Sequence, residues 1–467
     1  MALTRRQVAF GALGAVAAGA VAAIASRPAA TLVPGRARSR PIASDPALPP
    51  HADAVVVGGG NVGAFTALCL AERGLSVALC EKGVVAGEAS GRSLGWIESI
   101  LIDPGEAALI VRAKELWPQV NARAGSDTGF RQTGVGALCS TEPEYEAAQQ
   151  WIREVSGASG YNPRFLSRGE SEYLINSSGS SWIAALYEPG DGLAEPRWIA
   201  PAVAEGARKR GATIHQHCAV RGIETSAGRC SGVVTEHGVI KTERVVLATG
   251  AWTGVLCGSL GMRLPLMPMY ATMSSVAPFA GVPRIPADHG QAGWRPEPDG
   301  GCSIGWRAVV VPVGRDAVRY GTQFSDLLRE MWSSASLGIG SETLHSFTTP
   351  RPWKLDEPSP FEATRILEPA PNPAFARAVF SDLHAVLPAF RTTHLRETWA
   401  GVLVATPDNL PILSAVDSIP GLFVGAALDN GLSIGPSAGE LMADLATGAT
   451  PRVATAPYRL SRLLASS

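Results

Sequence analysis

The chain has 467 residues, which is enough for two or three domains with well-buried cores. Lys and Arg (40) balance Asp and Glu (41), and the formal net charge of −1 gives no electrostatic case for nucleic-acid binding. The seven cysteines and eight histidines are scattered without a C-x-x-C pair or a metal-ligand spacing. We therefore expect neither a disulfide framework nor a metal site, and we interpret the near pair His215 and His217 as structural.

The N-terminus predicts export. Residues 4–10 (TRRQVAF) hold an arginine pair and precede an uncharged Ala/Gly/Val segment that ends at Ala25. This pattern is typical of a twin-arginine signal in residues 1–26, and that route carries folded, cofactor-loaded proteins. The apolar stretch 8–25 is marginal for stable insertion because alanine and glycine dominate it, so cleavage and anchoring both stay open. We expect a tether over 27–51, and a location in the periplasm or on the outer face of the cytoplasmic membrane.

The stretch from Val55 to Gly63 (VVVGGGNVG) predicts a dinucleotide site. Its glycines satisfy G-x-G-x-x-G between an expected strand and the amphipathic segment 64–72. Backbone without Cβ can approach a pyrophosphate, and a helix N-terminus favours the negative charge there. The next expected strand, 75–80, ends at Glu81, where a carboxylate can accept hydrogen bonds from a ribose diol. A glycine turn made for packing alone is the weaker alternative.

The elements that follow predict an α/β fold with two interleaved domains. Helices are expected near 106–124, 142–155 and 197–210, strands near 134–140, 213–218, 220–226, 230–236 and 244–248, and more β structure over 264–320. Residues 422–447 repeat the order strand, glycine turn, helix. We expect a Rossmann-like nucleotide-binding domain from 52–100, 192–260 and 395–467, an α+β substrate domain with a mixed antiparallel sheet from 101–191 and 261–394, and an insertion at 324–361.

Several longer segments resemble one group of enzymes. They are 72–92 (ERGLSVALCEKGVVAGEASGR), 238–252 (GVIKTERVVLATGAW), 307–313 (RAVVVPV), 353–365 (WKLDEPSPFEATR) and 398–413 (TWAGVLVATPDNLPIL). With the signal and its tether, nearly the whole chain resembles the amino-acid-oxidase superfamily of FAD enzymes and, within it, the membrane-associated L-amino acid deaminases of Proteus. The resemblance implies FAD as the cofactor. Non-covalent binding is expected, because no Cys or His matches a flavin attachment position.

The resemblance also implies the residues that bind FAD. The glycines of the fingerprint would hold the pyrophosphate, Glu81 the adenosine ribose and Val220 the adenine, while 88–92 would run beside the flavin. Gly250, Trp252 and 431–434 would border the isoalloxazine. The full expected set is Gly58, Gly60, Asn61, Val62, Gly63, Glu81, Lys82, Glu88, Ala89, Ser90, Gly91, Arg92, Gly95, Val220, Gly250, Trp252, Gly401, Asp429, Gly431, Leu432, Ser433 and Ile434.

Arg307 matches the arginine that pairs with the substrate carboxylate in the deaminases. A guanidinium can bind a carboxylate through two parallel hydrogen bonds, and an unpaired charge in the apolar strand GWRAVVVPV would be costly. Trp96 stands where the deaminases carry a glutamine, and Asp429-Asn430 where they carry Gly-Trp. Trp96 is either a packing residue or a wall of the pocket. Asp429 either favours polar or cationic side chains or is a turn residue.

The expected reaction is oxidative deamination of an L-amino acid. Hydride leaves Cα for the flavin, and the imino acid hydrolyses to a 2-oxo acid and ammonia; nothing in the sequence nominates a general base. The resemblance implies a membrane acceptor, a quinone or cytochrome. Alternatives are a D-amino acid, glycine or a secondary amine as substrate, or an electron carrier without a substrate. The apolar residues of the insertion either face lipid or quinone, or cover the substrate domain; they are Phe324, Leu327, Leu328, Met331 and Trp332.

Overall fold

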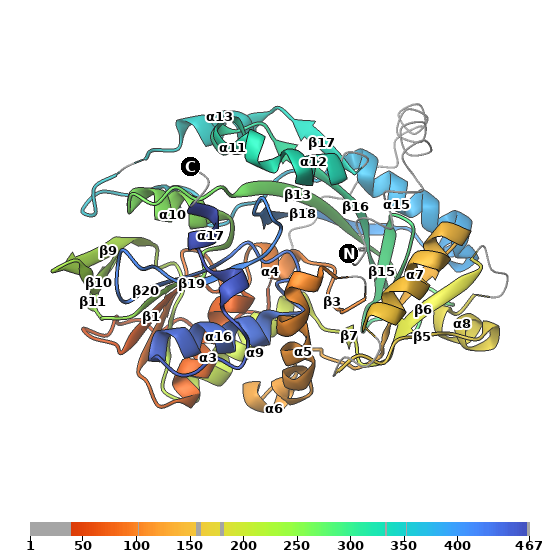
Figure 1. Ribbon diagram of the computed structural model, residues 1–467, viewed down its shortest axis with the longest axis horizontal. Helices are drawn as coiled ribbons and strands as arrows, with labels where there is room; N and C mark the ends of the chain where they lie inside the picture. Colours follow the sequence, from red (N-terminus) through yellow and green to blue (C-terminus); the bar gives the residue numbers. More distant parts are fainter. Residues whose placement is uncertain are drawn as a thin grey trace.

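The computed structural model describes residues 39–100, 102–155, 160–177, 182–331, 334–351 and 353–464. The expected signal and anchor, and most of the expected tether, lie outside these residues. Within the described part, none of the helices combines the length and apolar character needed to cross a membrane. Two sheets organise the molecule, one on each side of Figure 1.

The first sheet has six strands, and its central strands are parallel. Its strands are buried on both faces, as expected for a parallel sheet covered on both sides. Only the edge pair runs antiparallel. The order is β19 (Ile412–Ala415), β20 (Leu422–Ala426), β12 (Val245–Leu247), β1 (Ala54–Val57), β2 (Val77–Cys80) and β8 (Thr213–His215).

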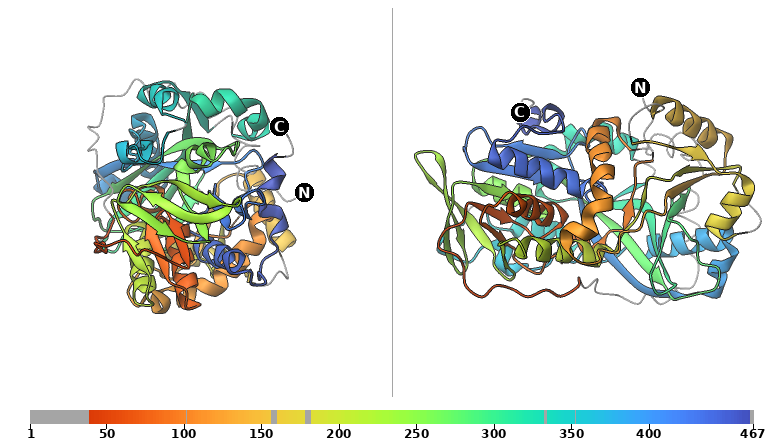
Figure 2. Two further views of the ribbon diagram at one scale, coloured as in Figure 1. Left: turned by 90° about the vertical axis from the view of Figure 1, so that its left-hand side faces the viewer. Right: turned by 90° about the horizontal axis from the view of Figure 1, so that it is seen from below.

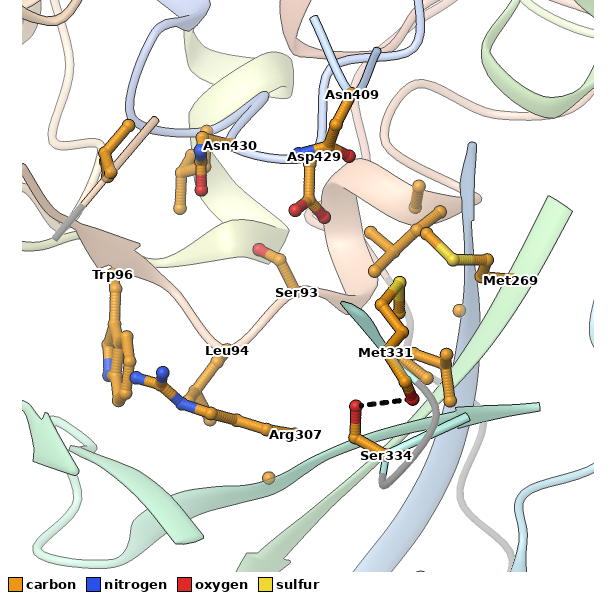
Figure 3. A pocket seen from close by; sticks show the side chains of 18 of the residues that line it. Ser93, Leu94, Trp96, Met269, Arg307, Met331, Ser334, Asn409, Asp429 and Asn430 are labelled. Carbon is orange, nitrogen blue, oxygen red and sulfur yellow. Dashed lines mark hydrogen bonds between the residues drawn. The ribbon is translucent and has the colours of Figure 1, made fainter. Parts of the chain in front are cut away.

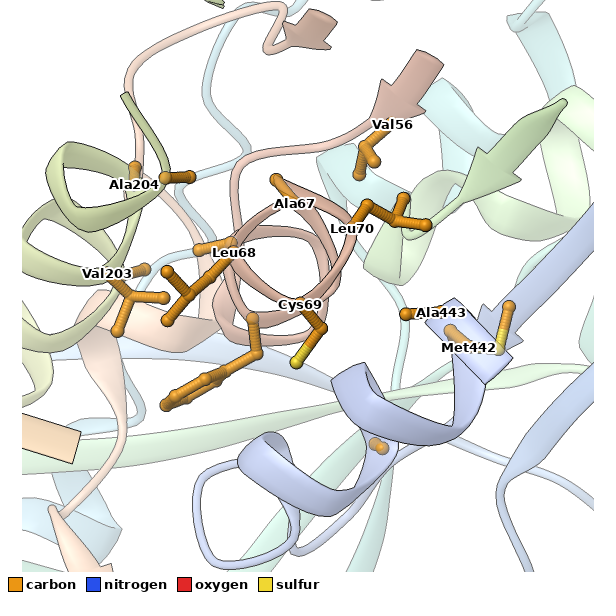
Figure 4. Close-up of a cluster of buried hydrophobic side chains, with 14 of the residues drawn as sticks. Val56, Ala67, Leu68, Cys69, Leu70, Val203, Ala204, Met442 and Ala443 are labelled. Atoms are coloured by element: carbon orange, nitrogen blue, oxygen red, sulfur yellow. The ribbon is translucent and has the colours of Figure 1, made fainter. Parts of the chain in front are cut away.

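Three helices cover one face of this sheet: α3 (Asn61–Glu72), α9 (Pro196–Arg208) and α16 (Gly435–Thr447). Figures 2 and 4 show α3 between its two neighbours. A Cβ at Gly439 would lie 2.4 Å from the Cβ of Phe65, so α16 reaches α3 this closely only because it has a glycine at the crossing. The buried α3 is therefore apolar around nearly its whole circumference.

A small sheet covers the opposite face of the six-stranded sheet. Its strands run in the order β11 (Gly238–Lys241), β10 (Arg229–Thr235) and β9 (Val220–Ser226). Alternate residues of β1 divide between the two sides, because side chains alternate along a strand. Val56 belongs to the helical core, whereas Val55 and Val57 pack with Ile223 and Val233.

The larger sheet is mixed, and α15 (Pro373–Val386) packs on one of its faces through a core that includes Trp294, Ile304 and Leu383. Parallel pairing occurs between β14 and β4 and between β16 and β17. The order is β18 (Leu395–Ala405), β13 (Met267–Val276), β16 (Cys302–Pro312), β15 (Ala292–Pro296), β14 (Ala287–His289), β4 (Val135–Cys139), β6 (Ala184–Glu188) and β5 (Arg164–Phe165), with β17 (Ala335–Gly338) beside β16.

Two segments lie elsewhere than expected. Strand β18 was assigned to the nucleotide-binding part but pairs with β13 along most of its length. Residues 106–124 were expected to open the second domain as one helix, but they pack in the helical core of the first, where Trp117 meets Phe65 edge to face at 6.0 Å. Pro118 also divides them, because proline disrupts helical hydrogen bonding, into α5 (Ala107–Leu116), η2 (Trp117–Gln119) and α6 (Val120–Ala124).

Shorter elements complete the fold. The expected helix 142–155 is α7 (Glu142–Val155), and the expected glycine turn after β20 leads into α16. The remaining elements are α4 (Ala89–Arg92), β3 (Trp96–Ile97), η1 (Pro104–Glu106), α8 (Arg168–Ile175), β7 (Gly192–Leu193), η3 (Gly250–Trp252), α10 (Thr253–Ser259), η5 (Pro388–Thr392), η6 (Ala456–Tyr458) and α17 (Ser461–Leu464).

The insertion forms a small α/β layer that lies over β13 and β16 at the top of Figure 1. Three of its predicted apolar residues, Phe324, Leu327 and Met331, are buried against methionines and valines of the large sheet. For these residues the covering alternative is correct; Trp332 lies outside the described residues. The helices of the insertion are α12 (Ser325–Glu330) and α13 (Ser341–Thr348), and α11 (Arg315–Tyr320) and η4 (Gly321–Phe324) lead into it. At its end, α14 (Pro360–Ala363) packs through Phe361 against Trp252 beside the small sheet.

Candidate active site

Two adjoining cavities lie between the two sheets, and Ala89 and Val402 line both of them. The larger has a volume of about 740 Å³ and the smaller about 100 Å³. Expected site residues divide between them. The smaller cavity takes Gly58, Gly60, Glu81, Lys82, Glu88, Ser90, Val220, Gly250 and Trp252, and the larger takes Arg92, Gly95, Trp96, Arg307, Gly401, Asp429, Asn430, Leu432 and Ser433.

The glycines of the fingerprint serve different purposes. A Cβ at Gly58 would lie 2.3 Å from the carbonyl oxygen of Ala248, and one at Gly63 would lie 1.9 Å from that of Gly58, so both are needed for packing. A Cβ at Gly60 would meet only Ser90, whose Oγ is 3.0 Å away. Gly60 therefore keeps open a space in the smaller cavity at the N-terminus of α3, which fits a pyrophosphate.

Glu81 lies where a ribose-binding acid is expected, at the end of β2. Its carboxylate accepts hydrogen bonds from the backbone N–H groups of Gly59 and Gly83, each at 2.7 Å. Burial raises the pKa of Glu81, although these bonds oppose the shift. Because a carboxylate has about four acceptor positions, the two bonds leave room for ribose hydroxyls.

Gly250 and Trp252 were expected beside the isoalloxazine, but they line the smaller cavity with Glu81 and Val220. The turn that contains Gly250 and Trp252 follows β12. Because β12 pairs directly with β1, this turn lies next to the glycine loop that follows β1. The Trp252 indole donates to the Glu88 carboxylate at 3.1 Å, and Lys82 contacts the same carboxylate at 2.6 Å. These side chains hold one another in place.

The turn before α16 borders the larger cavity. Leu432 and Ser433 line it, whereas Gly431 and Ile434 line neither cavity and support the turn. The Ser433 hydroxyl accepts a hydrogen bond from the Glu98 N–H at 3.0 Å, and the Ser433 carbonyl accepts one from the Trp117 indole at 2.8 Å. This places the positive end of a 13-residue helix at the cavity, where it favours a group that gains negative charge.

Asn61, Val62, Gly63 and Gly91, which were also expected to bind the cofactor, line neither cavity. Asn61 contributes indirectly, because its backbone N–H donates to the Ser90 hydroxyl at 2.9 Å and so joins the start of α3 to the loop beside it.

One face of the large sheet forms the opposite wall of the larger cavity. The register brings residues of four neighbouring strands, β18, β13, β16 and β15, to this face. Glycines among them leave room for larger groups: a Cβ at Gly293 would lie 2.7 Å from the Trp96 ring. The wall consists of Met269, Ala271, Met273, Gln291, Gly293, Gly305, Arg307, Val309, Gly401 and Leu403.

Arg307 extends from β16 into this cavity, beside Trp96 (Figure 3). Its guanidinium forms an ion pair with the buried Asp288 and lies 5.9 Å from the centre of the Trp96 ring. The Trp96 indole donates to the Trp294 carbonyl at 2.9 Å, which fixes the ring. Trp96 thus serves both expected purposes, because it packs against the sheet and forms a wall of the cavity.

A buried polar cluster holds the segment that follows Trp96. Ser99 donates through its N–H and its hydroxyl to Asp191, at 2.7 and 2.8 Å, and Lys114 contacts Asp191 at 3.0 Å and Glu188 at 3.1 Å. Burial raises the pKa of Asp191 to about 6, although Lys114 opposes the shift.

No cluster of three or more metal-ligating side chains occurs in the described part of the chain. The His215 ring contacts the carbonyl of Asp45 at 3.1 Å and the hydroxyl of Thr213 at 2.9 Å. All seven cysteines are buried and free, as expected.

Sequence reasoning missed Asp288, Gln291 and Asn409. Asp288 lies in β14, and Gln291 lies in the turn between β14 and β15. Only the pairing of this hairpin with β16 brings both residues next to Arg307. No local pattern in the sequence reveals this pairing.

Comparison with known proteins identifies relatives over most of the chain. A family model described as FAD dependent oxidoreductase matches residues 53–445. The structure of L-amino acid deaminase from Proteus myxofaciens in complex with anthranilate is 36% identical, with a TM-score of 0.88, over 92% of this chain and 98% of that one. The structure of L-amino acid deaminase from Proteus vulgaris is 32% identical, with a TM-score of 0.85, over 92% of this chain and 100% of that one. Glycine oxidase of Pseudomonas putida is 25% identical over 86% of this chain and 97% of its own length.

We predict that Gly60→Val abolishes flavin retention, because the added side chain fills the space kept for the pyrophosphate. The measurement is the ratio of flavin to protein absorbance, with circular dichroism as the test of folding. Gly258→Val is the matched control, since a Cβ there meets nothing within 4 Å. A folded Gly60→Val protein with its full flavin content would contradict the assignment of this cleft.

We predict that the FAD is bound without a covalent bond. Cys80 lines the smaller cavity, and no other cysteine of the described residues lines either cavity. A hydrogen bond with Cys218, together with burial, raises the pKa of the Cys80 thiol, which disfavours the reactive thiolate. Acid precipitation should therefore release free FAD into the supernatant. Yellow colour that stays with the pellet would refute this.

Proposed function

We propose that this chain, which belongs to the family of FAD-dependent oxidoreductases, catalyses the oxidative deamination of an L-amino acid to the 2-oxo acid and ammonia. One observation carries the proposal: the smaller cavity, which we assign to the nucleotide, adjoins the larger cavity, and the far wall of the larger cavity presents Arg307. The similarity to the two Proteus deaminase structures supports the same reaction type.

FAD held by the smaller cavity would supply the hydride acceptor for the Cα–H of the substrate, and the imino acid would then be hydrolysed by water. The residues of the chain supply orientation. Asp288 and Trp96 restrict the Arg307 guanidinium, whose remaining N–H groups can hold the substrate carboxylate in one direction. Among the described residues that line the larger cavity there is no histidine, lysine, cysteine or tyrosine, although carboxylates are present. We attribute the rate to positioning in the cavity and assign no general base.

The larger cavity, of about 740 Å³, must hold the isoalloxazine as well as the substrate, so its size does not exclude a small substrate, and glycine oxidases are among the relatives. D-amino acids, glycine and secondary amines remain the alternatives. The chirality of the substrate is part of the proposal and is tested directly by comparing enantiomers.

We also propose that the electrons pass to a quinone or cytochrome at the membrane, and that the exported protein faces that membrane. The insertion supports this in a way that the sequence did not predict. Its inner residues cover the sheet, but it also presents a set of exposed apolar side chains that a membrane surface would cover. They are Leu337, Ile339, Leu344 and Phe347, and Val318 of the preceding helix α11 is exposed beside them; the exposed fractions are 45 to 83%.

We predict that Arg307→Ala lowers kcat/KM for every amino acid substrate, because the carboxylate loses its partner. Truncating one member of such a charged pair costs about 2 to 5 kcal/mol, so the loss should be roughly thirtyfold or more. Ammonia release measures it, and Arg197→Ala, which removes a cation outside the larger cavity, is the control. An Arg307→Ala enzyme with near wild-type rates would end the carboxylate-anchor assignment.

We predict that membranes or a quinone analogue stimulate turnover, and that the double variant Ile339→Asp/Leu344→Asp loses the stimulation by membranes while it keeps its rate with a soluble dye. Ile183→Asp is the matched control, since Ile183 is exposed but lies outside the insertion. Stoichiometric hydrogen peroxide without any stimulation by membranes would count decisively against a membrane acceptor.

A further inference from the structure

The larger cavity has opposite electrostatic character at its two ends. Arg307 and Trp96 lie on one side in Figure 3, and Asp429 and Asn409 lie together on the other. The carboxylate of Asp429 is directed into the space between them. A molecule that spans the cavity therefore meets a guanidinium at one end and oxygen acceptors at the other.

The second end is built by three loops that pack together. Asn430 donates to Glu106 at 2.7 Å, which joins the turn before α16 to η1. A Cβ at Gly105 would lie 2.5 Å from Leu410, so the same loop also contacts the turn after β18. These contacts bring Asp103 and Asp408 to the same lining as Asp429.

Asn409 gives a second indication of what this end binds. Its side-chain oxygen is buried and has no hydrogen-bond partner in the described part of the chain. A buried acceptor without a donor is costly, and a ligand that supplies N–H groups would satisfy it. Asn409 also has a positive φ of 58°, so the loop holds a strained conformation at this position.

The charge of the lining also favours a ligand that carries a positive group. Six carboxylates and two guanidinium groups line the cavity, and both guanidinium groups already form ion pairs, Arg92 with Glu368 and Arg307 with Asp288. Two of the carboxylates are also paired, Asp326 with Arg329 and Asp408 with Arg462. Among the lining side chains themselves, carboxylates outnumber guanidinium groups. Inside a cleft with low-dielectric walls such an excess attracts cations and repels anions.

The middle of the cavity is apolar. Methionines and aliphatic side chains separate the two ends, and they provide contact for a methylene chain. They are Leu94, Met269, Ala271, Met273, Leu327, Met331 and Leu403.

We propose that the substrate is an amino acid with a long basic side chain, whose carboxylate binds Arg307 and whose terminal ammonium or guanidinium binds Asp429 and the Asn409 oxygen. This assignment rests on the proposed deaminase function and names its substrate class. It gives Asp429 the role of a specificity-determining residue.

Binding of inert ligands to the FAD-loaded enzyme tests the proposal without turnover. We would titrate 4-aminobutanoate, 6-aminohexanoate and 8-aminooctanoate against butanoate, hexanoate and octanoate, and follow the visible spectrum of the flavin at 0.15 M salt. These compounds have no α-amino group, so they report on the cavity even if the proposed reaction is wrong. The proposed deamination has a test of its own, and it would be contradicted if no amino acid released ammonia.

We expect at least one amino-carboxylate to bind about tenfold more tightly than the carboxylate of equal length, as for a hydrogen-bonded charged group. Asp429→Asn should remove most of this ratio, and Asn409→Asp, which adds a charge and tolerates the positive φ, should increase it. Asp417→Asn, which removes an equal charge from an exposed position outside the cavity, should leave it unchanged. Equal binding within every pair, or a ratio that Asp429→Asn does not alter, would overturn the proposal.

Discussion

Arg92 is the side chain on which the arrangement of the site most depends. Its guanidinium is 3% exposed and donates to the carbonyl oxygens of Gly87 and Ala400, each at 3.1 Å, and to the Glu368 carboxylate at 2.5 Å. The Trp399 indole in turn donates to the Arg92 carbonyl at 3.0 Å. A buried guanidinium without partners costs several kcal/mol, so these acceptors must all be in place. One residue thus joins the loop beside the nucleotide cleft to the large sheet.

That junction determines what the cavity can do. Because β18 is held against α4, Val402 lies at the boundary of the two cavities, and the smaller cavity adjoins the larger one, whose wall presents Arg307. Both walls belong to packed sheets and are therefore rigid. A rigid arrangement can orient Cα–H by binding the substrate carboxylate through Arg307, so positioning can supply the rate without an assigned general base. Loops, which tolerate change better, supply the opposite end and with it the choice of side chain.

The sequence predicted the local parts of this arrangement well. The order of strand, glycine loop and helix at Val55, Glu81 at the end of β2, and the second glycine turn before α16 all follow from short-range patterns, and the structure has each of them. For Arg307 the sequence argument was that a charge in an apolar strand needs a partner and that the substrate carboxylate is this partner. The structure already pairs Arg307 with Asp288, so its role as the carboxylate anchor stays a prediction.

Long-range pairing accounts for the rest. Strand β18 carries a pattern that fits either sheet, and only its register with β13 assigns it to the larger one. Gly250 and Trp252 line the smaller cavity because β12 pairs with β1, which is again a non-local contact. The apolar residues of the insertion have a helical spacing that does not distinguish a buried face from an exposed one. Their burial depends on the methionines that β13 places beneath them.

The central claim is that an L-amino acid reduces the flavin in this cavity, and anaerobic titration of the purified enzyme tests it most directly. L-amino acids and their D-enantiomers would be added under nitrogen while the flavin absorbance is followed. The account predicts complete bleaching by one or more L-amino acids and none by the matching D-enantiomers. Bleaching by D-amino acids or secondary amines alone, or by none of the compounds, would contradict it.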